Sequence, residues 1–132
     1  MFAFRLDTRS GVPTYLQLVD QVRRGLLLGY LQDGDKLPTV REVATTLVVN
    51  PNTVAKAYRE MEHAGLTVAR AGQGTFVTGN VDRVPAAIYA RQAHRLRSWV
   101  AGAHEAGLGP EQIRALVSAI LDEDAARVER AA

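Results

Sequence analysis

The spacing of the apolar residues changes at Gly65, and this change limits the folds that the chain can adopt. Before Gly65 the apolar residues recur with the 3.6-residue period of helices. After it, the residues on either side of Ala71-Gly72-Gln73-Gly74 follow the two-residue period of strands. Glycines at such a turn are typical of a β-hairpin. We therefore expect a mainly α fold that carries a small β-hairpin.

Three helices are expected before the hairpin. The first follows Pro13 and fades near Gly29. Thr39 and Glu42 have the spacing of a capping box, which starts a short second helix. The apolar positions of the three helices predict a shared core formed by Leu16, Val19, Leu26, Val43, Leu47, Val54 and Met61.

The third helix is expected to begin at Asn50-Pro51 and to run to about Ala64. Asn50 is a candidate cap, and proline is tolerated at the first helical position because its missing amide needs no partner there. One face of this helix is apolar and consists of Val54, Ala57, Tyr58 and Met61. The opposite face carries amides and bases, namely Asn52, Lys56, Arg59 and His63. Such side chains bind base edges and phosphates, although a solvated helix face has the same composition.

The order of helix, short helix, tight turn, helix and hairpin is that of a winged helix-turn-helix. In this motif the helix after the turn enters the major groove of DNA, and the hairpin, or wing, lies along the backbone or minor groove. We therefore expect a DNA-binding domain over residues 1–80. A winged helix used for protein–protein contact, without DNA recognition, is the alternative.

A second region, residues 81–132, is expected to form two amphipathic helices. The first is broken at Gly107-Leu108-Gly109, and Pro110 starts the second. Two helices alone cannot bury both of their apolar faces, so pairing with the same helices of a second chain is expected. The residues predicted for this dimerisation are Ile88, Leu96, Trp99, Val100, Ile113, Leu116 and Leu121. The alternative is that both helices fold back on the first domain of the same chain.

Composition and residue spacing argue against an enzyme. The sequence has no cysteine, which excludes disulfides, thiolate zinc sites and cysteine nucleophiles and fits a reducing cytoplasm. His63, His94 and His104 are scattered without metal-ligand spacing. The net charge of +2 permits nucleic-acid binding without requiring it. We expect no catalytic residues, no metal, no cofactor, no membrane contact and a cytoplasmic location.

Four runs of residues resemble the GntR family of bacterial transcription regulators. They are Tyr15-Leu16-Gln17, Gly34-Asp35-Lys36-Leu37-Pro38-Thr39-Val40-Arg41-Glu42, Val49-Asn50-Pro51-Asn52-Thr53-Val54-Ala55-Lys56-Ala57-Tyr58-Arg59-Glu60 and Gly72-Gln73-Gly74-Thr75-Phe76-Val77. The third run looks like the YtrA subfamily in particular. The resemblance covers about residues 11 to 78. Val48 departs from it, because a smaller or polar residue is common at that position.

The resemblance implies a dimeric regulator that binds a palindromic DNA operator. We expect a repressor rather than an activator, because a dimer on promoter DNA blocks polymerase without a further contact surface. Whether an effector binds is left open by the sequence. YtrA-like proteins are similar in having a short dimerising tail. The residues expected to contact DNA lie at the start of the second helix, on the third helix and in the wing. They are Thr39, Arg41, Asn50, Asn52, Thr53, Lys56, Arg59, Arg70, Gly72, Gln73 and Gly74.

Overall fold

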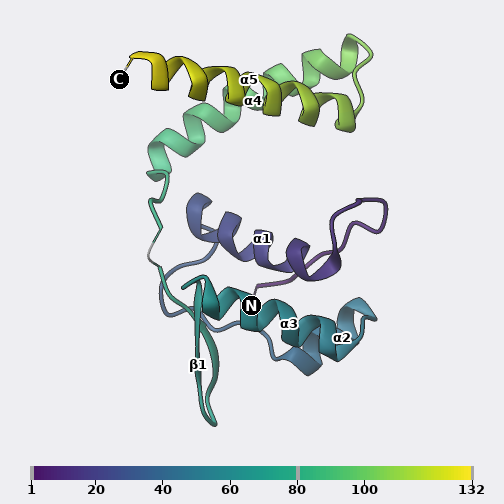
Figure 1. The fold of residues 1–132 in the computed structure, drawn as a ribbon, viewed down its shortest axis with the longest axis vertical. Coiled ribbons are helices and arrows are strands. Elements are labelled where there is room, and N and C mark those ends of the chain that lie inside the picture. The colour runs from purple at the N-terminus through teal and green to yellow at the C-terminus, as the bar shows by residue number, and fades with distance from the viewer. Residues whose placement is uncertain (1, 80, 132) are drawn as a thin grey trace. The chain divides into compact units, whose positions relative to one another are not determined.

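The computed structural model describes residues 2–79 and 81–131, and the chain divides into two compact units, Met1–Ala86 and Ala87–Ala132. The elements of the first unit are α1 (Thr14–Leu28), α2 (Val40–Leu47), α3 (Pro51–His63), β1 (Thr67–Arg70) and β2 (Gly74–Val77). α4 (Ala86–Glu105) and α5 (Pro110–Ala131) follow. Figure 1 shows the hairpin projecting from the helices of the first unit. The mainly α class with one hairpin is confirmed, whereas Asn80, the expected domain boundary, lies outside the described residues.

The ends of the helices follow the capping signals in the sequence. Thr39 Oγ1 accepts a hydrogen bond of 3.1 Å from the Glu42 amide at the start of α2. Asn50 Oδ1 accepts one of 2.8 Å from the Asn52 amide at the start of α3. Each side chain satisfies an amide that has no partner within its helix. The two caps therefore define where both helices of the helix-turn-helix begin.

The core of the first unit differs from the predicted one at α1. Val19, Leu26, Val43, Val54 and Met61 are buried as expected, and Leu47 packs against the core partly buried. Leu16 is 37% exposed, so its assignment to the core was wrong, and Leu18 is fully buried instead. Successive helical residues are about 100° apart, which places Leu16 and Leu18 on nearly opposite sides of α1. The buried face of α3, in contrast, is the predicted one throughout.

An N-terminal segment that the sequence analysis assigned to no element forms part of the core. The Phe4 side chain is only 7% exposed. Its ring contacts Phe2 edge-to-face at a centroid distance of 5.0 Å and the Tyr58 ring of α3 at 6.3 Å. The segment before α1 therefore supplies aromatic packing to the recognition helix of the predicted motif.

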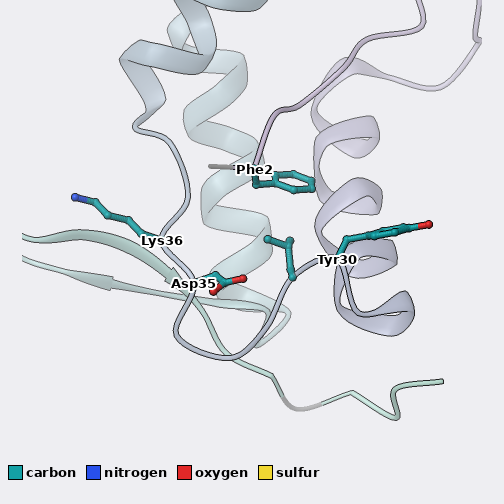
Figure 2. A pocket seen from close by; sticks show the side chains of 5 residues that line it. Phe2, Tyr30, Asp35 and Lys36 are labelled. Carbon is teal, nitrogen blue, oxygen red and sulfur yellow. The ribbon is translucent and has the colours of Figure 1, made fainter. Parts of the chain in front are cut away.

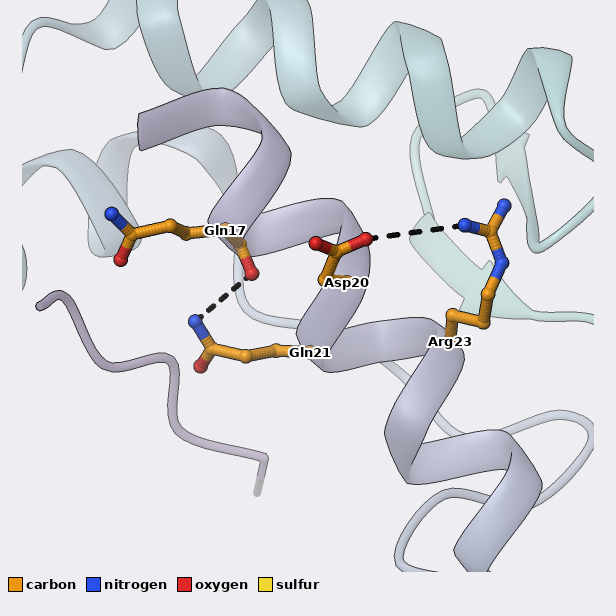
Figure 3. Close-up of polar contacts among 4 residues, drawn as sticks. All are labelled: Gln17, Asp20, Gln21 and Arg23. Atoms are coloured by element: carbon orange, nitrogen blue, oxygen red, sulfur yellow. Dashed lines mark hydrogen bonds and ion pairs between the residues drawn. The ribbon is translucent and has the colours of Figure 1, made fainter. Parts of the chain in front are cut away.

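Two glutamines of α1 hold this segment by its backbone. Gln21 Oε1 accepts from the Arg5 amide at 2.8 Å, and Gln21 Nε2 donates to the Arg5 carbonyl at 2.7 Å. Gln17 makes the same pair of bonds with Asp7, at 2.9 and 3.1 Å. Figure 3 shows the two glutamines one turn apart, with Gln21 also donating to the Gln17 carbonyl. The side chains thus replace the backbone partners that an extended segment otherwise finds in a sheet.

The loop between α1 and α2 adds a third backbone segment to the hairpin. Thr67 pairs with Val77 and Arg70 with Gly74 in an antiparallel register. On the other side of β2, Lys36 forms a bridge with Phe76, and the Leu37 amide donates to the Thr75 carbonyl at 2.9 Å. The base of the hairpin is therefore held from both sides of β2.

We expect Thr67→Val to stabilise the first unit by about 1 kcal/mol, because the Thr67 hydroxyl is buried and unpaired. Its Oγ1 is the buried side-chain polar atom without a hydrogen-bond partner among the described residues, and valine has the same shape without the hydroxyl. Urea denaturation measures the difference. Thr78→Val is the matched control and should be destabilising, since Thr78 Oγ1 donates to the Gly65 carbonyl at 2.7 Å. Destabilisation by both substitutions would contradict the prediction.

Within the described ranges, no helix combines the length and apolar character needed to cross a membrane.

Candidate nucleic-acid interface

The turn between α2 and α3 contains a strained residue. Val48 has a φ of 54°, a left-handed conformation that is unfavourable for a β-branched side chain. The Val48 and Val49 amides close the end of α2 by hydrogen bonds to the Ala44 carbonyl. The Val48 side chain itself is 88% exposed. The strain is therefore the cost of a turn that places α3 directly after α2.

We expect Val48→Gly to stabilise the domain by about 0.5–1 kcal/mol, since relief of a left-handed conformation exceeds the entropy cost of glycine. The change in thermal midpoint or in urea midpoint measures this gain. Val49→Gly is the control, because Val49 packs partly buried against the core and should lose stability on truncation. A lower stability of the Val48 variant would contradict the strain argument.

The tyrosine of α3 fixes the position of this helix. Tyr58 is buried, and its hydroxyl donates a hydrogen bond to the Pro38 carbonyl, just before α2. Burial raises the pKa of Tyr58 well above its usual value, and the negative charge of Glu42 raises it further. The neutral phenol therefore persists and keeps α3 attached to the start of α2.

The polar face of α3 is open to solvent. Asn52, Lys56 and Arg59 are exposed, and Thr53 is half-buried. Lys56 Nζ lies 4.0 Å from the centroid of the Tyr15 ring, a cation–π contact between α3 and α1. This pairing joins residues of two different helices, so no local pattern in the sequence predicts it.

Some predicted contact residues have their side-chain oxygens engaged in the fold. The Thr39 and Asn50 oxygens cap α2 and α3. Among the described residues, the side chains of Arg41, Asn52 and Arg59 form no hydrogen bond or ion pair within the chain. Of the predicted contact residues on α2 and α3, Arg41, Asn52 and Arg59 therefore have side chains that are most available to bind a partner molecule.

The wing presents a tip of small residues and an arginine held by an aromatic ring. Gly72 has a φ of 73°, and Gln73 is exposed beside it. Gly74, the other predicted glycine, opens β2 with a φ of 126° and is half-buried. The Arg70 guanidinium lies 4.8 Å from the centroid of the Phe76 ring. The backbone at the tip of the wing is therefore exposed, and the Arg70 guanidinium beside it is held against the Phe76 ring.

The predicted dimerisation residues occupy α4 and α5 and are mostly exposed. Ile88, Leu96, Trp99, Leu116 and Leu121 are between 41% and 63% exposed, and Val100 is half-buried. Ile113 is 8% exposed, so it already belongs to the interior of the chain. Val117, Ile120 and Val128 of α5, which were not in the predicted set, are also exposed. These helices therefore carry large apolar side chains that are left uncovered.

Within residues 2–79 and 81–131, no other group of side chains is arranged for catalysis or metal binding. The described residues hold no group of three or more His, Asp or Glu suited to a metal. An open pocket is lined by Phe2, Tyr30, Leu31, Asp35 and Lys36 (Figure 2). Its carboxylate is engaged in a turn, since Asp35 Oδ2 accepts from the Gln32 amide at 2.9 Å. The pocket thus offers no pair of groups for acid–base catalysis.

The region from α1 to β2 is similar to known regulatory proteins. The family model described as "Bacterial regulatory proteins, gntR family" matches residues 14–77. The HTH-type transcriptional repressor YtrA of Bacillus subtilis is 45% identical over 76 residues, 58% of either chain. The match thus spans about three fifths of the length of YtrA and of two other curated regulators.

Solved structures extend the similarity. YtrA from Sulfolobus acidocaldarius, described as a GntR-family transcription factor, has a TM-score of 0.55 and 32% identity, covering 77% of this chain and 99% of that one. The DNA-binding domain of AraR, solved in complex with operator ORX1, has a TM-score of 0.51 at 23% identity, covering 59% and 100%. The similarity to the AraR domain shows a shared fold only. The resemblance read from the sequence is confirmed, including its YtrA-like character.

Proposed function

The chain belongs to the GntR family of bacterial regulatory proteins, and we propose that it is a DNA-binding transcription regulator that recognises its operator through the winged helix-turn-helix. The observation that carries this proposal is the division of α3 into two faces. One face is buried throughout, and the other presents Asn52, Lys56 and Arg59 to solvent. The relatives reported above are named as transcription regulators and not as enzymes.

The exposed polar side chains and the wing backbone can each contact a particular chemical group of DNA. The Asn52 side-chain amide can form two hydrogen bonds with the edge of adenine, and the Arg41 guanidinium can donate two to the acceptors of guanine. Lys56 supplies a point charge for a phosphate. The wing glycines allow the backbone at Gln73 to approach the duplex closely.

The active form that we propose is a cytoplasmic homodimer that binds a palindromic operator and represses transcription. The exposed apolar side chains of α4 and α5 support dimerisation, because large exposed apolar surfaces mark association sites. A dimer on promoter DNA blocks polymerase without a further contact surface, which favours repression.

The proposal is tested by selecting bound duplexes from a random DNA pool. We expect enrichment of an inverted repeat whose half-sites are about one helical turn apart, ~34 Å, or a multiple of it. If the folded protein enriches no sequence, the winged helix is a protein–protein interaction module instead.

We expect Arg41→Ala to weaken binding to the selected operator by ~1–3 kcal/mol, the usual discrimination of a bidentate base contact. A fluorescence anisotropy titration measures the affinity. Arg24→Ala on α1 is the control for the loss of one exposed positive charge. The melting temperature of the Arg41 variant should stay within a few degrees of the parent, since the side chain is exposed. Unfolding of the Arg41 variant would give this residue a structural role.

A further inference from the structure

The register of the hairpin places one set of side chains on a single outer face of the wing. Cross-strand partners lie on the same face of a sheet, and residues two apart on one strand do so too. Lys36 pairs with Phe76, and Gly74 pairs with Arg70. Val68, the partner of Phe76 on β1, lies two residues from Arg70. Lys36, Val68, Arg70, Gly74 and Phe76 therefore share one face, which we call the outer wing face. Thr67 and Val77, with the opposite orientation, are buried.

The two cations of the outer wing face are held in place by their neighbours. A Cβ built on Gly74 would lie 2.9 Å from Lys36 Cε, so the lysine side chain crosses the space that glycine leaves open. Figure 2 shows Lys36 extending away from Phe2 and Tyr30 on the side where the strands run. The Arg70 guanidinium lies over the Phe76 ring. Glycine and phenylalanine thus position a lysine and an arginine on the same face.

Both cations are exposed and lack an acidic partner. Among the described residues, neither Lys36 nor Arg70 forms an ion pair. The rest of the face, which consists of Val68, Gly74 and Phe76, offers no side-chain donor or acceptor that could read a base edge. Two fixed positive charges without reading groups suit a polyanion backbone rather than a specific base sequence.

We propose that the outer wing face binds the sugar-phosphate backbone of operator DNA, with Lys36 and Arg70 on neighbouring phosphates. This inference rests on the proposed function and adds Lys36, a residue of the loop before α2, to the DNA-contacting groups. The contact is independent of sequence and adds to affinity at every duplex. Each cation contributes about one unit to the slope of log affinity against log salt.

The two lysines of the sequence make a direct test possible. Lys36 and Lys56 are the only lysines, one at the base of the wing and one on α3. The full chain is treated with a limiting amine-reactive acetylating reagent, with and without the selected operator duplex, and each lysine is quantified by mass spectrometry. We expect the duplex to slow acetylation of both lysines severalfold.

The pattern of protection separates the two proposals. Protection of Lys56 alone, with Lys36 reacting as fast as in free protein, would overturn the outer wing face as a contact and leave the regulator proposal standing. Protection of neither lysine, together with no retention of any duplex, would overturn the regulator proposal itself.

Substitutions measure the contribution of Lys36 to affinity. Lys36→Gln should weaken binding by up to about tenfold at 0.1 M salt and reduce the salt slope by about one. Lys36→Arg keeps the charge and should retain both affinity and slope. Arg24→Gln removes an exposed charge of α1 and should leave the slope unchanged. An unchanged slope in Lys36→Gln, in a variant with the parent melting temperature, would refute the contact.

Discussion

A chain that ends at Ala86 should bind an inverted-repeat operator at least a hundredfold more weakly than the full chain. Without α4 and α5 the two winged helices bind independently, and the second half-site loses the effective concentration that a dimer provides, worth 10²- to 10⁴-fold as an order of magnitude. Sedimentation equilibrium should show a monomer, and anisotropy titration should show the loss of affinity.

The shortened chain is cut at Ala86 because the residues just before it belong to the first unit. The Val84 amide donates to the Leu27 carbonyl at 2.9 Å, and Val81 packs partly buried against the core. A chain cut at the originally expected boundary would lose both contacts, so weaker DNA binding could arise from instability alone.

Trp99→Arg tests the same point in the full chain. Trp99 is 42% exposed on α4, and a charge there would be buried without a partner in a dimer. Trp99→Phe keeps an aromatic side chain and serves as the control. A shortened chain that remains dimeric with full operator affinity would show that α4 and α5 are not the dimerisation element. An arginine variant that stays dimeric would exclude Trp99 from the interface.

The second large effect is expected at the N-terminal segment. Phe4→Ala should destabilise the first unit by about 3–5 kcal/mol, the usual cost of truncating a buried phenylalanine. The loss is large because Phe4 contacts Tyr58, the residue that attaches α3 to the start of α2. It is comparable to the whole stability of many small domains, about 5–15 kcal/mol. Chemical denaturation followed by circular dichroism measures the change.

Two further variants separate packing from backbone attachment in this segment. Phe2→Ala should cost less than Phe4→Ala, since Phe2 is only partly buried. Gln21→Ala removes both hydrogen bonds to Arg5 and should cost about 1–2 kcal/mol. A change below about 1 kcal/mol in Phe4→Ala would mean that the segment does not pack on the core in solution.

The elements of the fold could be predicted from local signals. Asn50 and Thr39 cap their helices through hydrogen bonds to amides two and three residues ahead. Gly29 ends α1 in a left-handed conformation, and the glycines of the wing allow its turn. These effects involve neighbours in the chain, so composition and spacing are sufficient to recognise them. The exposed face of α3 was predictable for the same reason, since helical period alone separates it from the buried face.

The contacts between elements were not predictable in this way. Leu16 and Leu18 are both apolar, and only the packing of α1 into the core of the first unit decided that Leu18 is buried and Leu16 exposed. Lys56 meets Tyr15 from another helix, 41 positions away in the sequence. Amphipathic periodicity gives the direction of a face only approximately, and it contains no information on which distant residue the face meets.

The sequence by itself therefore determined the helices, their caps, the hairpin and the family, because each depends on neighbouring residues or on a contiguous motif. Only the tertiary structure decided that Phe4 belongs to the core and that Lys36 joins Arg70 on the wing. The Phe4 position depends on side chains of α1 and α3, and the Lys36 position on a bridge to Phe76, 40 residues later. Such placements arise from packing between distant segments, whose free energy exists only once the chain has folded.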